Sequence, residues 1–151
     1  MIVIGHRGAA GYEPENTLRS FEKAISLGVD MIEFDVRRCK SGELIIIHDD
    51  NVDRTTNGKG KVSELNLDTL QQFDAGKGEH IPTLIETLQF INRRVKVDIE
   101  IKEENIATDV AKIIDTFISQ GWQNSDFLVT SFLETELQAF RKINTQVPIG
   151  V

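Results

Sequence analysis

The chain has 151 residues, 40% of which are hydrophobic, and a formal net charge of −7 at pH 7. This length can bury a core as one domain, and the acidic balance argues against broad electrostatic attraction to nucleic acid or anionic membranes. Cys39 is the only cysteine, which excludes an intrachain disulfide and a thiolate metal site. There is neither an apolar run of membrane-spanning length nor a basic segment before Ile2-Val3-Ile4, so we expect a cytoplasmic protein without an integral membrane segment.

The first predicted element is a short buried strand at Ile2-Val3-Ile4, which ends at Gly5-His6-Arg7-Gly8. The glycines that flank His6 and Arg7 allow the backbone to turn sharply and to approach a ligand closely. The carboxyl ends of parallel strands are where α/β folds hold their active sites. His6 and Arg7 are therefore candidates for chemistry, although a turn that merely contains them is the alternative.

A strand-helix-strand unit is predicted from this first strand onward. Asn16 or Thr17 can cap a helix over residues 18–27, and Gly28 can end it. The strand expected over residues 30–36 alternates apolar and charged residues, so Glu33 and Asp35 project from the same face. An ordinary strand with one solvent-exposed polar face is the alternative.

A hairpin is predicted next, because Ser41-Gly42 forms a turn signal before the apolar residues 44–47. So short a connection cannot hold the crossover that parallel strands need. Folding symmetrically about this turn places Asp35 opposite His48, which would bring two acids and an imidazole into one patch. Such a patch suits a hard metal ion beside a proton-transfer group. A polar loop over residues 49–61 follows.

The remaining elements alternate between helices and strands. The strand expected over residues 95–102 places Glu100 and Lys102 on one face, which repeats the logic of Glu33 and Asp35. Helices are expected over 67–73, after Thr83 through Ile91, over 106–118 and through 137–143, and further strands over 127–129 and 147–151. This order indicates an α/β fold with mostly parallel pairing.

The polar residues at the strand ends suggest a single site, since in a barrel these ends converge on one mouth. Three carboxylates without cysteine suit an oxygen-preferring cation such as Mg²⁺ or Ca²⁺. Two histidines beside a metal can act as general base and general acid. Arg7 and Lys102 supply positive charge for an oxyanion such as a phosphate.

A series of short motifs resembles the glycerophosphodiester phosphodiesterase family. The matches occur in the family's order and spacing from residue 5 to about residue 132, and the set is specific although each motif alone is weak. They are Gly5-His6-Arg7-Gly8, Pro14-Glu15-Asn16-Thr17, Glu33-Phe34-Asp35-Val36, His48-Asp49, Arg54-Thr55-Thr56-Asn57-Gly58, Ile81-Pro82-Thr83-Leu84 and Glu100-Ile101-Lys102.

The resemblance implies a TIM-type (β/α) barrel that hydrolyses glycerophosphodiesters, small-molecule substrates, to glycerol 3-phosphate and an alcohol. In the family's mechanism a glycerol hydroxyl attacks phosphorus, and water then opens the resulting cyclic phosphate. The resemblance implies that Glu33, Asp35 and Glu100 bind the metal. It implies that His6 and His48 carry out acid–base catalysis. It also implies that Arg7 and Lys102 bind the phosphate and that Asn16 lies near it.

The length of the chain departs from the family. A complete (β/α)₈ barrel needs about 250 residues, so we expect residues 1–151 to form one incomplete domain with about six of the eight strands and the last strands absent. Two alternatives to hydrolysis of glycerophosphodiesters stay open. One is a related phosphodiesterase that acts on lysophospholipids, and the other is a truncated non-catalytic domain that binds a partner. An open barrel edge also favours self-association.

Overall fold

The computed structural model describes residues 1–151. The strands and helices follow one another in the alternating order that the sequence predicts. The strands are β1 (Ile4–His6), β2 (Met31–Arg38), β3 (Leu44–Ile46), β4 (Lys96–Ile101), β5 (Phe127–Thr130) and β6 (Ile149–Gly150). The helices are α1 (Leu18–Ser26), α2 (Leu67–Gln72), α3 (Leu84–Ile91), α4 (Ala107–Ser119) and α5 (Glu134–Ile143), with 3₁₀ turns η1 (Val62–Glu64) and η2 (Asn124–Asp126).

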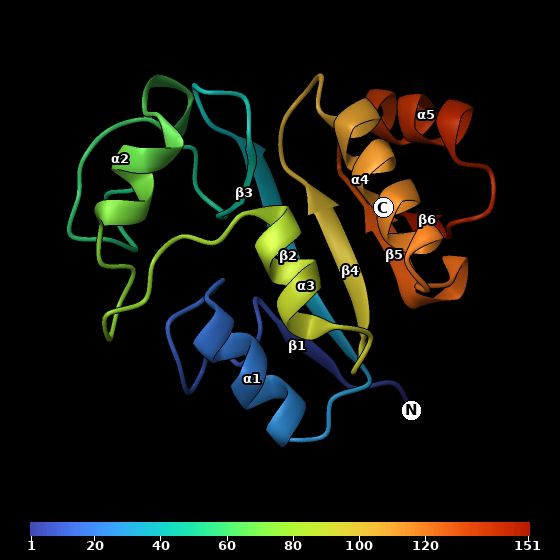
Figure 1. Cartoon of the computed structure of the whole chain (residues 1–151), viewed down its shortest axis with the longest axis horizontal. Coiled ribbons are helices and arrows are strands. Elements are labelled where there is room, and N and C mark those ends of the chain that lie inside the picture. The colour runs from blue at the N-terminus through green and yellow to red at the C-terminus, as the bar shows by residue number, and fades with distance from the viewer.

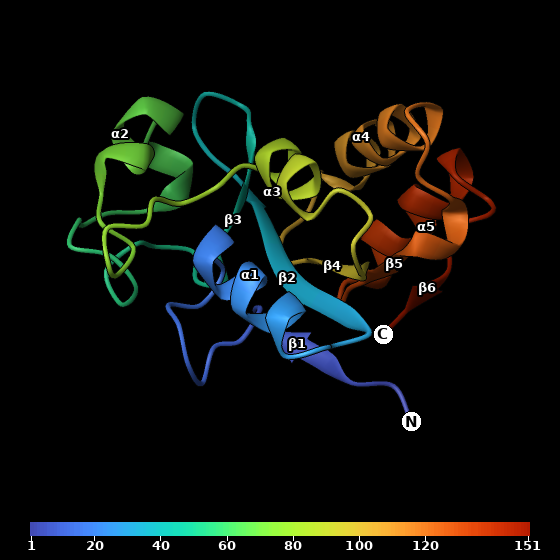
Figure 2. The ribbon, with the colours of Figure 1, turned by 60° about the horizontal axis from the view of Figure 1, so that its bottom comes forward.

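One sheet organises the molecule, with strand order β1-β2-β4-β5-β6 and parallel pairing throughout this path. The strand β3 pairs antiparallel with β2 beyond the end of β1, on the edge of β2 that β4 does not occupy. Helices α1, α3, α4 and α5 lie along one face of the curved sheet (Figures 1 and 2). The predicted α/β class and the incomplete parallel barrel are therefore confirmed.

The alternation in β2 explains how the sheet is oriented. Ile32, Phe34 and Val36 are fully buried in the main core between the sheet and the helices. Each large apolar side chain buried in this way contributes about 1.5–3 kcal/mol relative to exposure. Because successive side chains alternate, the same packing directs Glu33 and Asp35 to the opposite face, where no helix covers the sheet.

Two threonines begin helices as the sequence predicts. Thr17 caps α1, and its Oγ1 accepts a hydrogen bond from the backbone N–H of Ser20. Thr83 caps α3 in a reciprocal capping box with Glu86. The α1 cap matters for the site, because it fixes the end of the loop that contains Asn16.

The segment between β3 and α3 is more ordered than a polar loop. Val52, Val62 and Leu70 are buried with Ile45 and Ile47 in a second, smaller core. This packing holds the residues that follow His48 against the β2–β3 hairpin.

The predicted register of the β2–β3 hairpin is wrong by one residue. Val36 pairs with Ile46, and the backbone N–H of Ile47 donates to the carbonyl of Asp35 at 3.0 Å. The connection has three residues, 40–42, because Cys39 rather than Lys40 faces Glu43 and Gly42 adopts a positive φ of 101°. His48 consequently lies in a bend after β3 rather than opposite Asp35.

The expectation that Ile2-Val3-Ile4 forms a buried strand is also wrong. The strand β1 is shifted to Ile4–His6, and Ile2 and Val3 are exposed by 71% and 50%. The reason is that β1 is an edge strand, paired with β2 on one side only.

The longest helix has 13 residues, and no helix has both the length and the apolar character needed to cross a membrane.

Candidate metal and phosphate site

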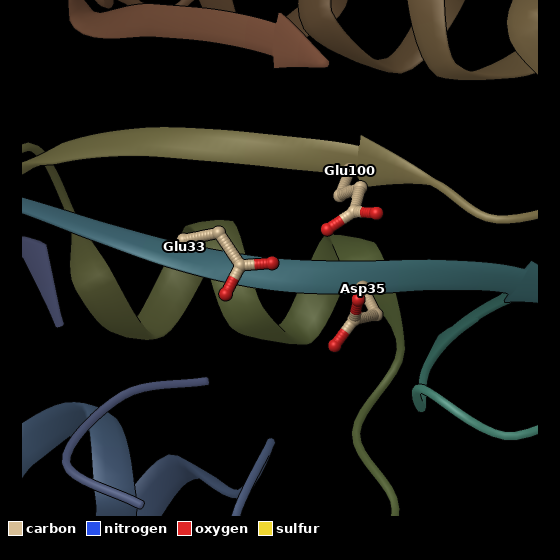
Figure 3. Close-up of side chains that lie close together, drawn as sticks. All are labelled: Glu33, Asp35 and Glu100. Carbon is tan, nitrogen blue, oxygen red and sulfur yellow. The ribbon is translucent and has the colours of Figure 1, made fainter. Parts of the chain in front are cut away.

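Three carboxylates meet on the face of the sheet that the helices leave open. Glu33 and Asp35 project from β2 and Glu100 from β4, and α3 lies on the far side of the sheet (Figure 3). Parallel pairing places Asp35 beside Glu100 in register. One oxygen from each of the three carboxylates lies within 4.8 Å of the other two. The predicted convergence of these side chains is therefore present in the structure.

The buried carboxylates are incompletely satisfied. Glu33 Oε1 and Asp35 Oδ1 are buried and have no hydrogen-bond partner. Burial, together with the charge of Asp35, raises the pKa of Glu33 to about 8, although the backbone N–H of Arg7 opposes part of this rise. Unpaired anionic oxygens that crowd one another favour a hard cation, and oxygen-only donors match Mg²⁺ or Ca²⁺. The residues present thus fit a divalent metal ion.

A fourth acid, Asp98, lies on the same face of β4 and pairs in register with Glu33. Burial raises its pKa to about 6, against the hydrogen bond of 2.8 Å that Thr130 Oγ1 donates to Asp98 Oδ1. Asp98 has no buried oxygen without a hydrogen-bond partner, whereas Glu33 and Asp35 each have one, Oε1 and Oδ1. Asp98 therefore borders the group of three rather than completing it.

Two cationic side chains lie against the carboxylates. Lys102 Nζ donates to Glu100 Oε1 at 2.9 Å and lies 4.0 Å from Asp35 Oδ1. Arg7 Nε lies 3.5 Å from Asp35 Oδ2. Both positions put positive charge beside the candidate metal site, where an anionic ligand of the metal would need it.

The backbone at Arg7 is specialised for this position. Arg7 has a φ of 51°, and its N–H donates to Glu33 Oε2 at 3.0 Å. The next residue must be glycine, since a Cβ at Gly8 (φ 84°) would lie 2.4 Å from Ser20 Oγ. The unusual turn is thus held by its contacts with α1 and with Glu33.

Asn16 contacts a carboxylate of the candidate metal site. Its Nδ2 donates to Asp35 Oδ2 at 3.0 Å, and its backbone N–H donates to the carbonyl of Arg7. Asn16 is 4% exposed and also has a positive φ of 57°. The structure thus connects Asn16 to Asp35, whereas the resemblance places it only near the site.

The two candidate catalytic histidines lie in different surroundings. His6 Nε2 is 3.8 Å from Glu33 Oε2, and the His6 side chain is 70% exposed. The ring of His48 contacts Asp49, with 2.8 Å between His48 Nδ1 and Asp49 Oδ1. His6 therefore adjoins the carboxylates directly, and His48 is linked to them only through other side chains.

The residues that make this link were quoted in the sequence motifs without a role. Arg54 hydrogen-bonds both Asp49 and Glu15, and Glu15 in turn accepts a hydrogen bond from Arg7. Their presence in motifs with the site residues was the only signal. No pattern in the sequence indicates that the loops containing Glu15 and Arg54, which are 39 residues apart, contact each other.

Comparison with known proteins shows the family to which this chain belongs. The family model of the glycerophosphoryl diester phosphodiesterase family matches residues 6–151. A Bacillus subtilis (strain 168) protein, YhdW, is 37% identical over 158 residues, which cover 100% of this chain and 65% of the relative. A glycerophosphodiester phosphodiesterase from Caldanaerobacter subterraneus subsp. tengcongensis is 36% identical, with 99% of this chain and 65% of the relative covered.

A solved structure of a phosphodiesterase is also similar to this chain. It is a phosphodiesterase from Oleispira antarctica in complex with the product sn-glycerol-3-phosphate, with 31% identity and a TM-score of 0.89. The match covers 99% of this chain and 65% of that chain. The chain thus spans about two thirds of the length of its relatives, and it belongs to the glycerophosphoryl diester phosphodiesterase family.

Proposed function

We propose that this chain supplies the metal and phosphate site of a glycerophosphodiester phosphodiesterase. The reaction is hydrolysis of one phosphate ester bond. Water adds a hydroxyl to phosphorus and a proton to the departing alcohol, which leaves glycerol 3-phosphate. The observation that carries the proposal is the convergence of Glu33, Asp35 and Glu100, with unpaired buried oxygens, beside Arg7 and Lys102.

The side chains divide the work of this reaction. Glu33, Asp35 and Glu100 hold a divalent cation, Mg²⁺ or Ca²⁺, which when bound offsets the charge that develops on the phosphate oxygens. Arg7 and Lys102 neutralise the same phosphate from the protein side. A phosphate diester is an anion, so an acidic chain needs these local cations to bind it.

Proton transfer is assigned to His6 and His48. One imidazole removes the proton from the attacking oxygen, and the other gives a proton to the alcohol oxygen as its bond to phosphorus breaks. The exposure of His6 beside Glu33 supports its access to a substrate that binds at the carboxylates. The contact of His48 with Asp49 leaves Nε2 as the ring nitrogen available for proton exchange.

Two further candidates share the same site. A relative from Homo sapiens that is 26% identical over 97% of this chain is named Lysophospholipase D GDPD1, and in such an enzyme the pocket walls rather than the charged residues would differ. A non-catalytic domain would keep metal binding but lack turnover. Head-group preference and turnover therefore have to be measured separately.

The test is hydrolysis of glycerophosphocholine and of a lysophospholipid. The measured quantity is the release of glycerol 3-phosphate from the first substrate and of lysophosphatidic acid from the second. The 151-residue chain and a chimera that adds the C-terminal third of YhdW should be assayed with Mg²⁺, with Ca²⁺ and with a chelator. We expect metal-dependent hydrolysis that Asp35→Asn abolishes and that Glu22→Gln, a change in an exposed ion pair, preserves. Metal binding without hydrolysis by either polypeptide would overturn the enzymatic proposal and favour the non-catalytic domain.

A further inference from the structure

Arg54, in the segment after β3, is held by two carboxylates. Its Nε donates to Asp49 Oδ2 at 2.9 Å, and its Nη2 donates to Asp49 Oδ1 at 3.0 Å. On the other side, Nη1 donates to Glu15 Oε2 at 3.0 Å, and Nη2 donates to Glu15 Oε1 at 2.7 Å. The guanidinium thus makes two forked interactions, a geometry that the single ammonium group of lysine cannot reproduce.

The two carboxylate oxygens that share Nη2 each hold one candidate active-site residue. Asp49 Oδ1 also contacts His48 Nδ1 at 2.8 Å. Glu15 Oε1 also accepts a hydrogen bond of 3.0 Å from Arg7 Nη1. A continuous line of contacts therefore runs from the ring of His48 to the guanidinium of Arg7, and its centre is one nitrogen atom of Arg54.

The arrangement is electrostatically stable although Arg54 is half exposed. Hydrogen bonds from Arg54 hold the pKa of Asp49 well below its usual range despite partial burial. The pKa of Glu15 is lowered as well, because Arg54 and Arg7 outweigh the effect of its burial. Both carboxylates are consequently ionised at neutral pH, and the charge of Arg54 is committed to them rather than available to a substrate phosphate.

We propose that Arg54 is a positioning residue that fixes His48 and Arg7 relative to each other; this inference rests on the proposed function. Through Asp49 it holds His48 as the tautomer with a proton on Nδ1, which leaves the lone pair of Nε2 free. Through Glu15 it holds the side chain of Arg7, whose Nε faces Asp35. A proton-transfer group and a phosphate-binding group on distant segments are thereby set by one side chain.

The proposal predicts different losses for different substitutions. Arg54→Gln removes both forks, so kcat should fall by up to about 100-fold, as expected when a catalytic group is misplaced by about an ångström. Arg54→Lys keeps the charge but not the forks, and it should recover only part of this loss. Because Arg54 has no hydrogen bond or ion pair with Glu33, Asp35 or Glu100, Mn²⁺ affinity should change far less than kcat in both variants.

Arg19→Gln is the matched control. Arg19 is as exposed as Arg54, at 51% against 50%, and its Nε donates to Glu13 Oε2 at 2.8 Å. It has no contact with Arg7, Asp49 or Glu15. Arg19→Gln should therefore leave both kcat and the state of His48 unchanged, since it removes an ion pair of the same kind without touching the line of contacts.

The decisive measurement does not depend on activity. The chain has three histidines, His6, His48 and His80, so ¹⁵N NMR of the imidazoles can report the tautomer of His48 at about pH 9, where an imidazole is neutral. We expect the wild-type ring to be protonated on Nδ1 and Arg54→Gln to shift it toward the Nε2-protonated form, with His80 unchanged. A tautomer of His48 that is the same in wild type and Arg54→Gln would overturn the inference.

The two proposals can fail separately. If the wild-type chain and the chimera hydrolyse no phosphodiester, the proposed function fails, and the NMR measurement still decides whether Arg54 positions His48. If hydrolysis is present and Arg54→Lys retains full kcat, the positioning role fails while the proposed function stands. A loss of kcat in Arg54→Gln that is matched by Arg19→Gln would also count against it, because it would reflect general loss of surface ion pairs.

Discussion

Two buried oxygens, Glu33 Oε1 and Asp35 Oδ1, have no hydrogen-bond partner, although the other oxygen of each side chain accepts a hydrogen bond. A buried carboxylate oxygen without a partner is costly, because the protein has removed its hydration without replacing it. The partner that would satisfy both oxygens, together with Glu100, is a cation bound at the point where the three carboxylates meet. At the residue scale, metal binding is thus the first property to test.

Asp35→Asn should weaken binding of Mn²⁺, used as a probe for Mg²⁺, by at least about tenfold, since it removes a ligand charge from the site. Isothermal titration calorimetry measures this directly. Asp98→Asn is the matched control, because Asp98 is a buried acid on the same face but its Oδ1 is already bonded by Thr130. Equal losses in the two variants would contradict the assignment of the metal to Glu33, Asp35 and Glu100.

His6→Ala and His48→Ala should each lower kcat by about 10²–10⁴-fold, because each removes one proton-transfer group. Mn²⁺ affinity should change little, since neither ring is placed among the three carboxylates. His80→Ala serves as the control, because His80 is exposed and contacts only Glu86. Loss of Mn²⁺ binding in His6→Ala would instead reassign His6 as a metal ligand.

At the scale of elements, strand alternation predicted that Glu33 shares a face with Asp35 and that Glu100 shares a face with Lys102. The expected convergence of strand ends in a parallel barrel then predicted that the two pairs meet. Strand alternation could not predict the hairpin register, which depends on whether Lys40 belongs to the strand or to a loop with Gly42 at positive φ.

The sequence also could not predict the line of contacts from His48 to Arg7. That link joins two loops through Arg54, and loop conformation has no periodic signal in the sequence.

The start of α4 shows the same limit. No local side chain caps this helix. The backbone N–H groups of Asn105, Ile106 and Ala107, at or just before its first residue, instead donate to the carboxylate of Glu136 in α5 at 2.7–3.1 Å. A sequence pattern cannot reveal a cap that lies about 30 residues away. Glu136 is buried, so the two helices depend on each other.

Glu136→Ala should destabilise the protein by about 2–3 kcal/mol, because hydrogen bonds to a charged group are among the stronger ones and the buried N–H groups would be left unsatisfied. Glu136→Gln retains one acceptor oxygen and should cost less. Urea unfolding followed by circular dichroism measures both. Glu134→Ala, in the exposed first turn of α5, should have little effect; a similar loss there would attribute the effect to removal of a negative charge from the N-terminus of α5 instead.

At the scale of the whole molecule, all eight residues expected in the site lie between His6 and Lys102, within β1, β2 and β4 or in the segments that follow β1, β3 and β4. These eight residues thus fall in the part of the relatives' length, about two thirds, that this chain spans. The two edge strands of the sheet, however, each have one side without a pairing strand. The strands β1 and β6 are each paired on one side only, and Ile2 and Val151 beside them are highly exposed.

We therefore expect the 151-residue polypeptide to self-associate when it is purified alone, because unpaired strand edges with apolar neighbours pair readily with other edges. Ile2→Lys should reduce this association, since a charge beside an edge strand opposes edge pairing, while Mn²⁺ affinity stays unchanged. Thr108→Lys, which adds the same charge on the exposed surface of α4, should not reduce it. Adding the C-terminal third of YhdW should have a larger effect than Ile2→Lys, because further strands can pair with β1 and β6 together. Light scattering of the four polypeptides measures the association, and a monodisperse 151-residue monomer would show that these edges are protected by the contacts already present.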